Sequence, residues 1–185
     1  MTKKALVPLA PGFEEIEAVT IIDVLRRAGV EVTVAGTVDG LVEASRGVRV
    51  MPDTTVGAVD PESFDLVVLP GGGPGTEALR DDPRILEMVR RHHAAGRLTA
   101  AVCAAPTVLA AAGIAARHRV TGHPSVRDAL EAAGADVADD RVVVDGNVVT
   151  SQGPGTSIEF AFALVERLCG AEKVRELNEG ILARV

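Results

Sequence analysis

The stretch LTAAVCAAPTVLA, residues 98–110, predicts a buried strand that turns sharply into a helix. Cys103 stands at the junction of the two elements. The small residues beside it, Ala101, Ala104 and Ala105, would permit the tight turn of a nucleophile elbow. The free N–H groups at a helix start favour a thiolate over a thiol, which would make this cysteine nucleophilic and oxidisable. A small buried cysteine without a chemical role is the alternative that the pattern leaves open.

Short apolar runs and helix-period segments alternate along most of the chain. Such alternation predicts a mainly parallel sheet covered by helices on both faces, which is an α/β fold. Further strands are expected in residues 3–10, 30–36, 64–75 (with a glycine-rich turn at the end) and 119–122, and helices in residues 14–28, 83–96, 124–134, 155–170 and 171–182. Residues 41–51 and 141–151 each predict a β-hairpin, the first a small excursion from the alternation. The 185 residues, 47% of them hydrophobic, suffice for one core, so we expect a single domain over residues 1–185.

The composition argues against several classes of function. The 19 Lys and Arg against 26 Asp and Glu give a net charge of −7, which disfavours binding to the phosphate backbone of a nucleic acid. Trp and Tyr are absent, so base-stacking platforms are not expected either. No apolar run is long enough for a membrane span or a secretory signal, which predicts a soluble cytoplasmic protein with two free thiols. No spacing of His, Cys, Asp or Glu matches a zinc site, and we expect neither a metal nor a cofactor.

The loops after the strands hold the other candidate residues, because ligands gather beyond the carboxyl ends of a parallel sheet. Glu17 shares a helical stripe with apolar residues, where burial would raise its pKa, although the pattern alone favours a structural or surface role. The glycine-rich residues 70–75 lack the lysine of a phosphate-binding loop and are either backbone donors to an oxyanion or a tight turn. His123 precedes a proline and would approach the same site or lie in a surface turn. His92 and His93 predict charges that cap the end of a helix.

Five segments together resemble the ThiJ/PfpI superfamily, and within it the DJ-1/YajL branch, with the Ala-Ala-Pro after the cysteine similar to bacterial YajL proteins: ALVPLAPGFEEIEAVTIIDVLRRAG, VVLPGGGPG, AAVCAAPTVLA, VTGHP and TSQGPGTSIEFAFALVE. The resemblance covers nearly the whole chain and implies a flavodoxin-like three-layer αβα sandwich that forms a homodimer. It also implies roles for individual residues. Cys103 matches the reactive elbow cysteine, and Glu17 matches a protonated glutamate that hydrogen-bonds it. Gly71, Gly72 and Ala104 match backbone donors beside the sulfur.

The resemblance further implies a pocket for a substrate or anion at the dimer edge, with Arg46, Arg27 and Pro154 among its residues. His123 matches a nearby histidine that is a candidate catalytic residue. Ala104 stands where protease-like members of the superfamily have a histidine, so peptide-bond hydrolysis is not expected. No His-x-Glu pair follows the cysteine, which argues against glutamine amidotransferase chemistry.

Two functions follow from the matched residues. The first is cofactor-independent detoxification of reactive dicarbonyls, of the glyoxalase III or protein deglycase type. In it the Cys103 thiolate adds to the aldehyde of methylglyoxal, and Glu17 moves protons until lactate is released. The second is redox sensing or chaperone action through oxidation of Cys103 to a sulfinate, without physiological catalysis. The expected partners are a small aldehyde or glycated substrate and a second copy of the chain, with no nucleic acid and no membrane.

Overall fold

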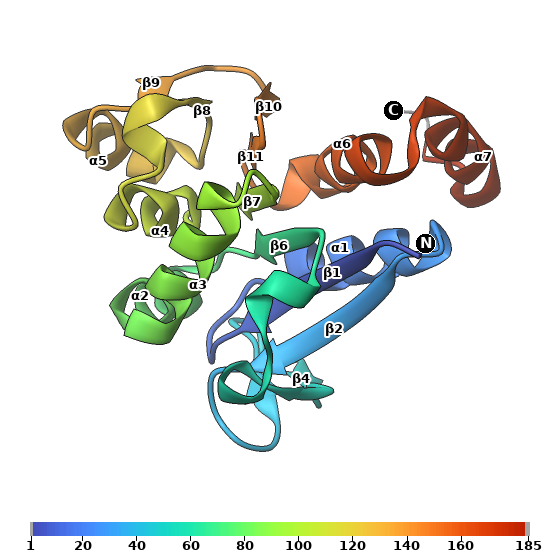
Figure 1. Cartoon of the computed structure of the whole chain (residues 1–185), viewed down its shortest axis with the longest axis horizontal. Helices are drawn as coiled ribbons and strands as arrows, with labels where there is room; N and C mark the ends of the chain where they lie inside the picture. Colours follow the sequence, from blue (N-terminus) through green and yellow to red (C-terminus); the bar gives the residue numbers. More distant parts are fainter. Residues whose placement is uncertain (1, 184–185) are drawn as a thin grey trace.

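The computed structural model describes residues 2–183 and builds them around one central sheet (Figure 1). Within these residues, seven strands form the sheet in the order β10-β11-β7-β6-β1-β2-β5. All neighbouring strands in it are parallel except β10 and β11. Their bounds are β1 Lys4–Leu9, β2 Glu31–Gly36, β5 Thr54–Thr55, β6 Leu66–Leu69, β7 Leu98–Val102, β10 Val142–Asp145 and β11 Val148–Ser151. The predicted α/β fold with a mainly parallel sheet is confirmed.

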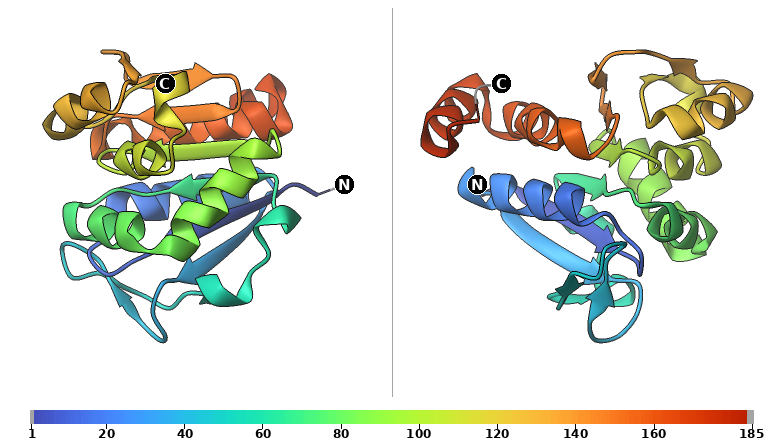
Figure 2. Two further views of the ribbon diagram at one scale, coloured as in Figure 1. Left: turned by 60° about the vertical axis from the view of Figure 1, so that its left-hand side comes forward. Right: turned by 180° about the vertical axis from the view of Figure 1, so that it is seen from behind.

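Helices cover both faces of this sheet, as Figures 1 and 2 show from different sides. One layer consists of α1 Glu15–Arg27, α6 Ser157–Cys169 and α7 Ala171–Ile181. The other layer consists of α2 Gly73–Asp81, α3 Pro83–Ala94, α4 Pro106–Ala111 and α5 Arg127–Ala132. Successive residues of β1 point to opposite faces, so Val7 joins the core under the first layer and Leu6 the core under the second. A strand with both faces covered requires an unbroken apolar run, which is the pattern that the sequence has here.

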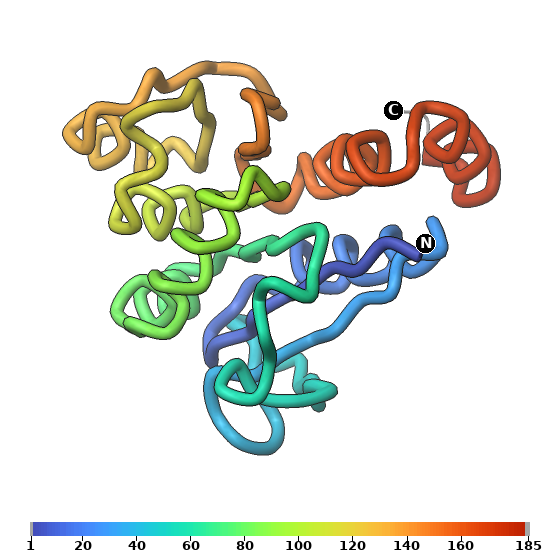
Figure 3. The backbone as a smooth tube through the Cα atoms, in the orientation of Figure 1, coloured from blue at the N-terminus to red at the C-terminus, as the bar shows by residue number. Residues whose placement is uncertain are grey.

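Two short pairs of strands lie outside the central sheet, one antiparallel and one parallel. β3 Val42–Glu43 and β4 Arg49–Val50 form the predicted first hairpin, and β8 Arg119–Val120 pairs with β9 Asp136–Val137. Short 3₁₀ helices complete the chain: η1 Val56–Ala58, η2 Pro61–Ser63, η3 Ala115–Arg117, η4 Pro124–Val126 and η5 Pro154–Thr156. The start of β1 and helix α7, which are far apart in sequence, lie on the same side of the molecule (Figure 3).

Helix α1 begins where a side chain can satisfy its first N–H groups. The Glu14 carboxylate is the N-cap and accepts a hydrogen bond from the backbone N–H of Glu17 at 2.8 Å. Two arginines in its last turn complement the helix dipole, and Gly29 follows with a φ of 82°. The helix predicted over residues 14–28 is confirmed to within one residue at each end. It places Glu17 in the turn nearest the carboxyl edge of the sheet.

The glycine-rich turn predicted after the strand in residues 64–75 is present, but the sequence did not predict the helix that begins inside it. Helix α2 begins inside it at Gly73, directly after Gly72, whose φ of 93° turns the chain away from β6. Pro74 lies in the first turn of α2, where a missing N–H costs nothing. Glycines lower helix propensity, so the sequence of this first turn conceals the helix that tertiary packing stabilises.

His92 does not cap α3 with a charge, contrary to the prediction. Its side chain is fully buried, and its two ring nitrogens lie 3.2 Å from the carbonyl oxygen of Pro61 and 3.1 Å from that of Leu98. Burial lowers the pKa of His92, and burial likewise lowers that of His93. Both rings are therefore biased toward the neutral form. Among residues 2–183, no helix is both long enough and apolar enough to cross a bilayer.

Candidate active site

Cys103 occupies a sharp turn between β7 and α4. It has a φ of 64°, a left-handed conformation that is costly for a residue with a side chain. Neighbouring segments hold it there: its N–H donates to the Ser151 carbonyl at 2.9 Å, and its carbonyl accepts from the His123 N–H at 2.8 Å. The side chain is half-buried, and Ala101 and Ala105 around the turn are fully buried. The predicted tight turn is present, and backbone hydrogen bonds to two other segments hold it in place.

Glu17 reaches this turn from the first turn of α1. Its side chain has no exposed surface, and Oε2 accepts a hydrogen bond from the Gly71 N–H at 2.7 Å. The other oxygen, Oε1, is buried without a hydrogen-bond partner among the described residues. Burial raises the pKa of Glu17 to about 7, against the opposing effect of its hydrogen bonds with Gly71 and Cys103. The helical pattern alone favoured a structural or surface role, and the structure places this carboxyl in the interior beside Cys103.

The glycines after β6 are required by close approach. A Cβ on Gly71 would lie 2.6 Å from the Cβ of Cys103 and 2.8 Å from Oε2 of Glu17. A Cβ on Gly72, which has a positive φ, would lie 2.4 Å from the carbonyl oxygen of Gly12. The Gly71 carbonyl also accepts from the Glu14 N–H at 2.9 Å. The Gly71 carbonyl and the Gly71 N–H therefore both join the glycine-rich loop to the start of α1, through the Glu14 N–H and the Glu17 carboxyl.

The backbone donors divide between the carboxyl and the sulfur. The backbone N–H groups of Gly72 and Ala104 act to lower the pKa of the Cys103 thiol, whereas the Gly71 N–H donates to Glu17. The expectation that Gly71 donates beside the sulfur is therefore wrong for this arrangement. Its N–H instead fixes the carboxyl that faces the thiol.

The thiol and the carboxyl titrate as a pair. Burial, followed by the negative charge of Glu17 and its hydrogen bond, raises the pKa of Cys103 to about 12, while the N–H groups of Gly72 and Ala104 act to lower it. Burial and the carboxylate outweigh the backbone donors that favour a thiolate at the helix start. Between these two pKa values the pair holds one proton, which lies on oxygen or on sulfur. When Glu17 holds it, the sulfur is a thiolate with two N–H donors.

Comparisons with known proteins identify the family to which this fold belongs. Residues 3–167 match the DJ-1/PfpI family. The chain belongs to this family. As a DJ-1/PfpI protein it is 48% identical to protein dj-1beta of Drosophila melanogaster, over 98% of both chains. It is 43% identical to the glutathione-independent glyoxalase DJR-1.2 of Caenorhabditis elegans, over 95% of this chain and 94% of that one.

Solved structures of DJ-1 proteins agree with the fold. The crystal structure of Drosophila DJ-1beta superposes with a TM-score of 0.95 at 47% identity and covers 98% of both chains. The structure of oxidized Toxoplasma gondii DJ-1 superposes with a TM-score of 0.92 at 42% identity, again over 98% of both chains. The flavodoxin-like sandwich implied by the sequence is therefore the fold of this DJ-1/PfpI protein.

His123 touches the elbow of this DJ-1/PfpI protein through its backbone. Its ring lies in an exposed loop, where Nδ1 accepts from the Ser125 N–H at 3.2 Å and lies 2.8 Å from the Ser125 hydroxyl oxygen. Because Nδ1 accepts this hydrogen bond, the ring proton of the neutral histidine is on Nε2. The structure shows no hydrogen bond between this ring and Cys103 or Glu17.

Arg46 and Arg27 lie at opposite ends of α1. The Arg46 N–H donates to Glu15 at 2.7 Å, at the start of the helix, whereas Arg27 pairs with Asp23 at 2.7 Å in its last turn. A helix of 13 residues is about 20 Å long, so one chain does not bring the two arginines into one pocket. Pro154 lies elsewhere, in a hollow between the start of α6 and Ile16 on α1.

The sequence analysis missed the residues that hold the site together. Ser151 was recognised only as the end of a hairpin, yet its carbonyl fixes Cys103. Its position at the end of the strand beside β7 was the available signal. The Glu15 carboxylate accepts from the Ser45 hydroxyl at 2.9 Å and from the Arg46 N–H, which ties the β3–β4 hairpin to α1.

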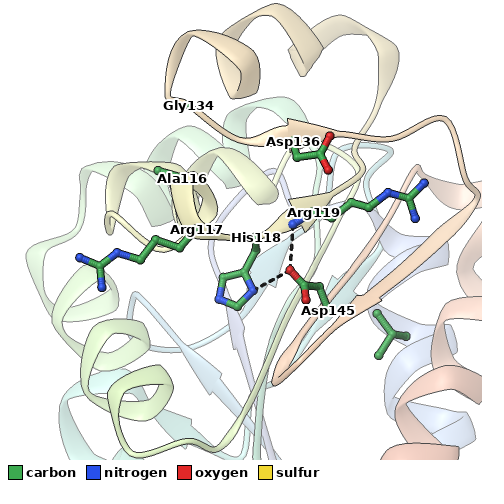
Figure 4. A pocket seen from close by; sticks show the side chains of 8 residues that line it. Ala116, Arg117, His118, Arg119, Gly134, Asp136 and Asp145 are labelled. Atoms are coloured by element: carbon green, nitrogen blue, oxygen red, sulfur yellow. Dashed lines mark hydrogen bonds and ion pairs between the residues drawn. The ribbon is translucent and has the colours of Figure 1, made fainter.

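A separate hollow contains a histidine–carboxylate pair (Figure 4). His118 Nδ1 lies 3.1 Å from Oδ2 of Asp145, which also accepts from the Arg119 N–H at 2.9 Å. None of the residues lining this hollow belongs to the Cys103 site. Within residues 2–183, no group of three His, Cys, Asp or Glu side chains is arranged to hold a metal ion.

Proposed function

We propose that the protein is a cofactor-independent glyoxalase that converts methylglyoxal and water to lactate. The observation that carries the proposal is the arrangement around the sulfur. Cys103 faces a carboxyl whose pKa is raised to about 7, and two backbone N–H groups point at the sulfur. A nucleophile, a proton shuttle tuned to neutral pH and fixed donors are the parts that this rearrangement needs. The glyoxalase name of the Caenorhabditis elegans relative supports the same reaction class.

The first step forms a carbon–sulfur bond. The Cys103 proton moves to the Glu17 carboxylate, and the sulfur attacks the aldehyde carbon of methylglyoxal. The carbonyl electron pair goes to oxygen, which takes the proton back from Glu17 and leaves a hemithioacetal. Glu17 returns to its ionised form and can act as a base in the next step.

The second stage moves hydrogen between the two carbons. The Glu17 carboxylate takes the proton from the former aldehyde carbon and passes it to the ketone oxygen, which gives an enediol. Glu17 then takes the hydroxyl proton from the sulfur-bearing carbon and delivers it to the neighbouring carbon, which gives the thioester of lactate. One carbon is oxidised and the other is reduced without an external oxidant. Water then hydrolyses the thioester, which releases lactate and restores the thiol. A protein-bound hemithioacetal or aminocarbinol adduct of methylglyoxal is an alternative substrate of the same chemistry.

The residue after the cysteine limits the reactions that the site supports. Ala104 supplies an N–H to the sulfur but no side chain that could protonate an amine leaving group. Peptide hydrolysis needs such a general acid, whereas addition to an aldehyde expels no group. The geometry therefore favours dicarbonyl chemistry over proteolysis or amide transfer.

Turnover of methylglyoxal by three variants tests the proposal. Cys103→Ser is expected to abolish lactate formation, and Glu17→Gln to lower kcat by about 10²–10⁴-fold, the usual contribution of a proton-transfer residue. Cys169→Ser is the matched control, because Cys169 is the exposed last residue of α6. Wild-type turnover in the Cys103→Ser protein would refute the mechanism.

Redox sensing or chaperone action is the second candidate, favoured by the access of solvent to a half-buried thiol and by the oxidized state named for the Toxoplasma gondii structure. Peroxide would convert the Cys103 thiol to a sulfenic acid and a second peroxide would give the sulfinic acid, each with release of water. The two N–H donors on the sulfur would stabilise the product. We expect intact mass to rise by about 32 Da, two oxygen atoms, on Cys103 before Cys169. Equal oxidation of both cysteines would argue against this candidate.

We also propose a homodimer built on the α1 face. Ile16 and Val19 on α1 are 56% and 48% exposed, and Ile158 on α6 is 38% exposed. Apolar side chains gathered on one face are typical of an interface. A second copy would also be needed to bring Arg27 near Arg46. Sedimentation velocity of the wild type and of Val19→Glu tests this, and a monomeric wild type would contradict it. A cytoplasmic location stays a prediction that cell fractionation would test.

A further inference from the structure

A hollow of about 280 Å³ lies at the end of the sheet opposite to Cys103. Its lining comes from the amino ends of the four central strands: Lys3 before β1, Asp65 before β6, Leu98 in β7 and Asn147 before β11. The end of α6 closes one side of it, and Figures 1 and 2 show this end beside the start of β1. The hollow is therefore separate from the site at the carboxyl edge.

Positive charge gathers in this hollow against the charge of the chain. Lys3, Arg97 and Arg167 line it together with a single carboxylate, that of Asp65, which leaves two positive charges in excess. The whole chain carries a net charge of −7. Asp65 accepts from the Lys3 ammonium at 3.1 Å. Among the described residues, neither Arg97 nor Arg167 has a carboxylate oxygen within ion-pair distance.

Backbone contacts hold the two guanidinium groups in place. Arg167 donates to the Gly146 carbonyl at 2.9 Å, and Arg97 donates to the Glu62 carbonyl. Each guanidinium carries five N–H groups, so most of its donors remain for another acceptor. The Asn147 amide donates to the Arg97 carbonyl at 2.9 Å and fixes the backbone beside the hollow. The two guanidinium groups are thus held in place while most of their N–H groups stay available to a ligand.

We propose that this hollow binds the phosphate group of a small ligand. A phosphate dianion matches the two excess positive charges, and the planar donor forks of arginine suit its oxygens. Leu168, half-buried in the wall, offers an apolar contact to the carbon part of a phosphate ester. The hollow of Figure 4 lacks this excess, because its lining contains two arginines, Arg117 and Arg119, and two aspartates, Asp136 and Asp145.

The competing explanation is that the arginines only complement helix dipoles. Arg167 lies in the last turn of α6, and Arg97 follows the end of α3, where positive charge is favourable without any ligand. Arg80, in the last turn of α2, has the same relation to its helix but does not line the hollow. Arg80→Gln is therefore the matched control.

Titrations followed by amide NMR, at constant ionic strength balanced with chloride, test the site. Inorganic phosphate and glycerol phosphate are the two probes, and we expect saturable shifts at Gly96, Arg97 and Asn147 in wild type. Arg97→Gln and Arg167→Gln should each raise the apparent Kd at least tenfold, and Arg80→Gln by less than about twofold. Tighter binding of glycerol phosphate would identify an organic phosphate as the ligand. Tighter binding of inorganic phosphate would identify the free ion as the ligand.

Three outcomes would overturn the proposal: no saturable shift, shifts that follow ionic strength alone, or equal weakening by all three arginine variants. Arg97→Lys and Arg167→Lys keep the charge and remove the fork, so intermediate Kd values are expected from folded proteins. Thermal melting identifies any variant that fails to fold. Methylglyoxal turnover of these variants should match wild type, because none of the substituted residues lies at the Cys103 site.

Discussion

The backbone N–H of Gly71 donates to Oε2 of Glu17 at 2.7 Å, so the loop after β6 orients the carboxyl that faces the reactive cysteine. The same glycine leaves no room for a Cβ between that carboxyl and Cys103. One residue therefore sets both the orientation of the Glu17 carboxyl and its closeness to the sulfur.

Gly71→Ala and Gly73→Ala should behave very differently although they are two residues apart. A Cβ at position 71 would lie 2.6 Å from the Cβ of Cys103, whereas one at position 73 meets nothing within 4 Å. We expect Gly71→Ala to lower methylglyoxal turnover by about 10²-fold through displacement of the pair, and to destabilise the fold by about 1–3 kcal/mol. Gly73→Ala should leave both nearly unchanged. Similar kinetics of the two variants would contradict this steric argument.

Burial of Glu17 should make the stability depend on pH with a definite sign. Its pKa is about 7 in the folded protein and 4.5 in the unfolded chain, so the folded state keeps the proton that the unfolded state has lost. Stability contributed by this group is complete below pH about 4.5 and is lost as pH rises to about 7. Relative to Glu17→Gln, the wild-type free energy of unfolding should fall by about 3 kcal/mol over that range.

Urea denaturation at intervals between pH 4 and 8 measures this difference. Glu87→Gln is a suitable control, because Glu87 is an exposed residue of α3. A constant difference between wild type and Glu17→Gln at all pH values would show that the carboxyl titrates normally in the folded protein.

The Glu15 carboxylate should control the mobility of the β3–β4 hairpin. It accepts from the Ser45 hydroxyl and the Arg46 N–H, and these hydrogen bonds lower the pKa of Glu15 against the effect of its partial burial. Glu15→Ala is expected to speed hydrogen exchange of the Arg46 amide by roughly tenfold or more, because that amide loses its acceptor. Exchange in β6 should stay unchanged. Protection of Arg46 in the variant would mean that other contacts hold the hairpin.

The sequence predicted those parts of the fold in which local pattern and tertiary packing agree. Residues 14–28 carry a cap, an apolar stripe and a terminal glycine, and α1 follows them closely. The chain from Gly73 onward combines weak helix formers with a proline, and α2 there depends on the core that buries Leu79. The prediction for His92 was wrong for a related reason. Its position in the helix predicts a positive charge, whereas its burial lowers its pKa and favours the neutral ring.

The candidate site was less predictable than the fold because most of its contacts are made by backbone atoms. The sequence of the glycine-rich loop does not predict which backbone N–H group acts on the sulfur and which donates to Glu17. The raised pKa of Cys103 comes first from burial and then from the carboxylate of Glu17, and periodicity contains neither quantity. Resemblance to a family identified the pair, and the structure shows that both groups are withdrawn from solvent at one turn.

The shared proton should be visible in the pH dependence of Cys103 alkylation. Below pH about 7 both groups of the pair are protonated, and above it the pair carries one negative charge that lies partly on sulfur. In a Cys169→Ser background, the rate of reaction with iodoacetamide should rise through pH about 7 and then level off. Adding Glu17→Gln removes one of the two titrating groups, so the step at pH about 7 should disappear. The Cys103→Ser protein reports Cys169 alone, whose pKa is raised by burial, and should react only at higher pH. A wild-type profile that resembles that of Cys169 would mean that Glu17 and Cys103 titrate independently.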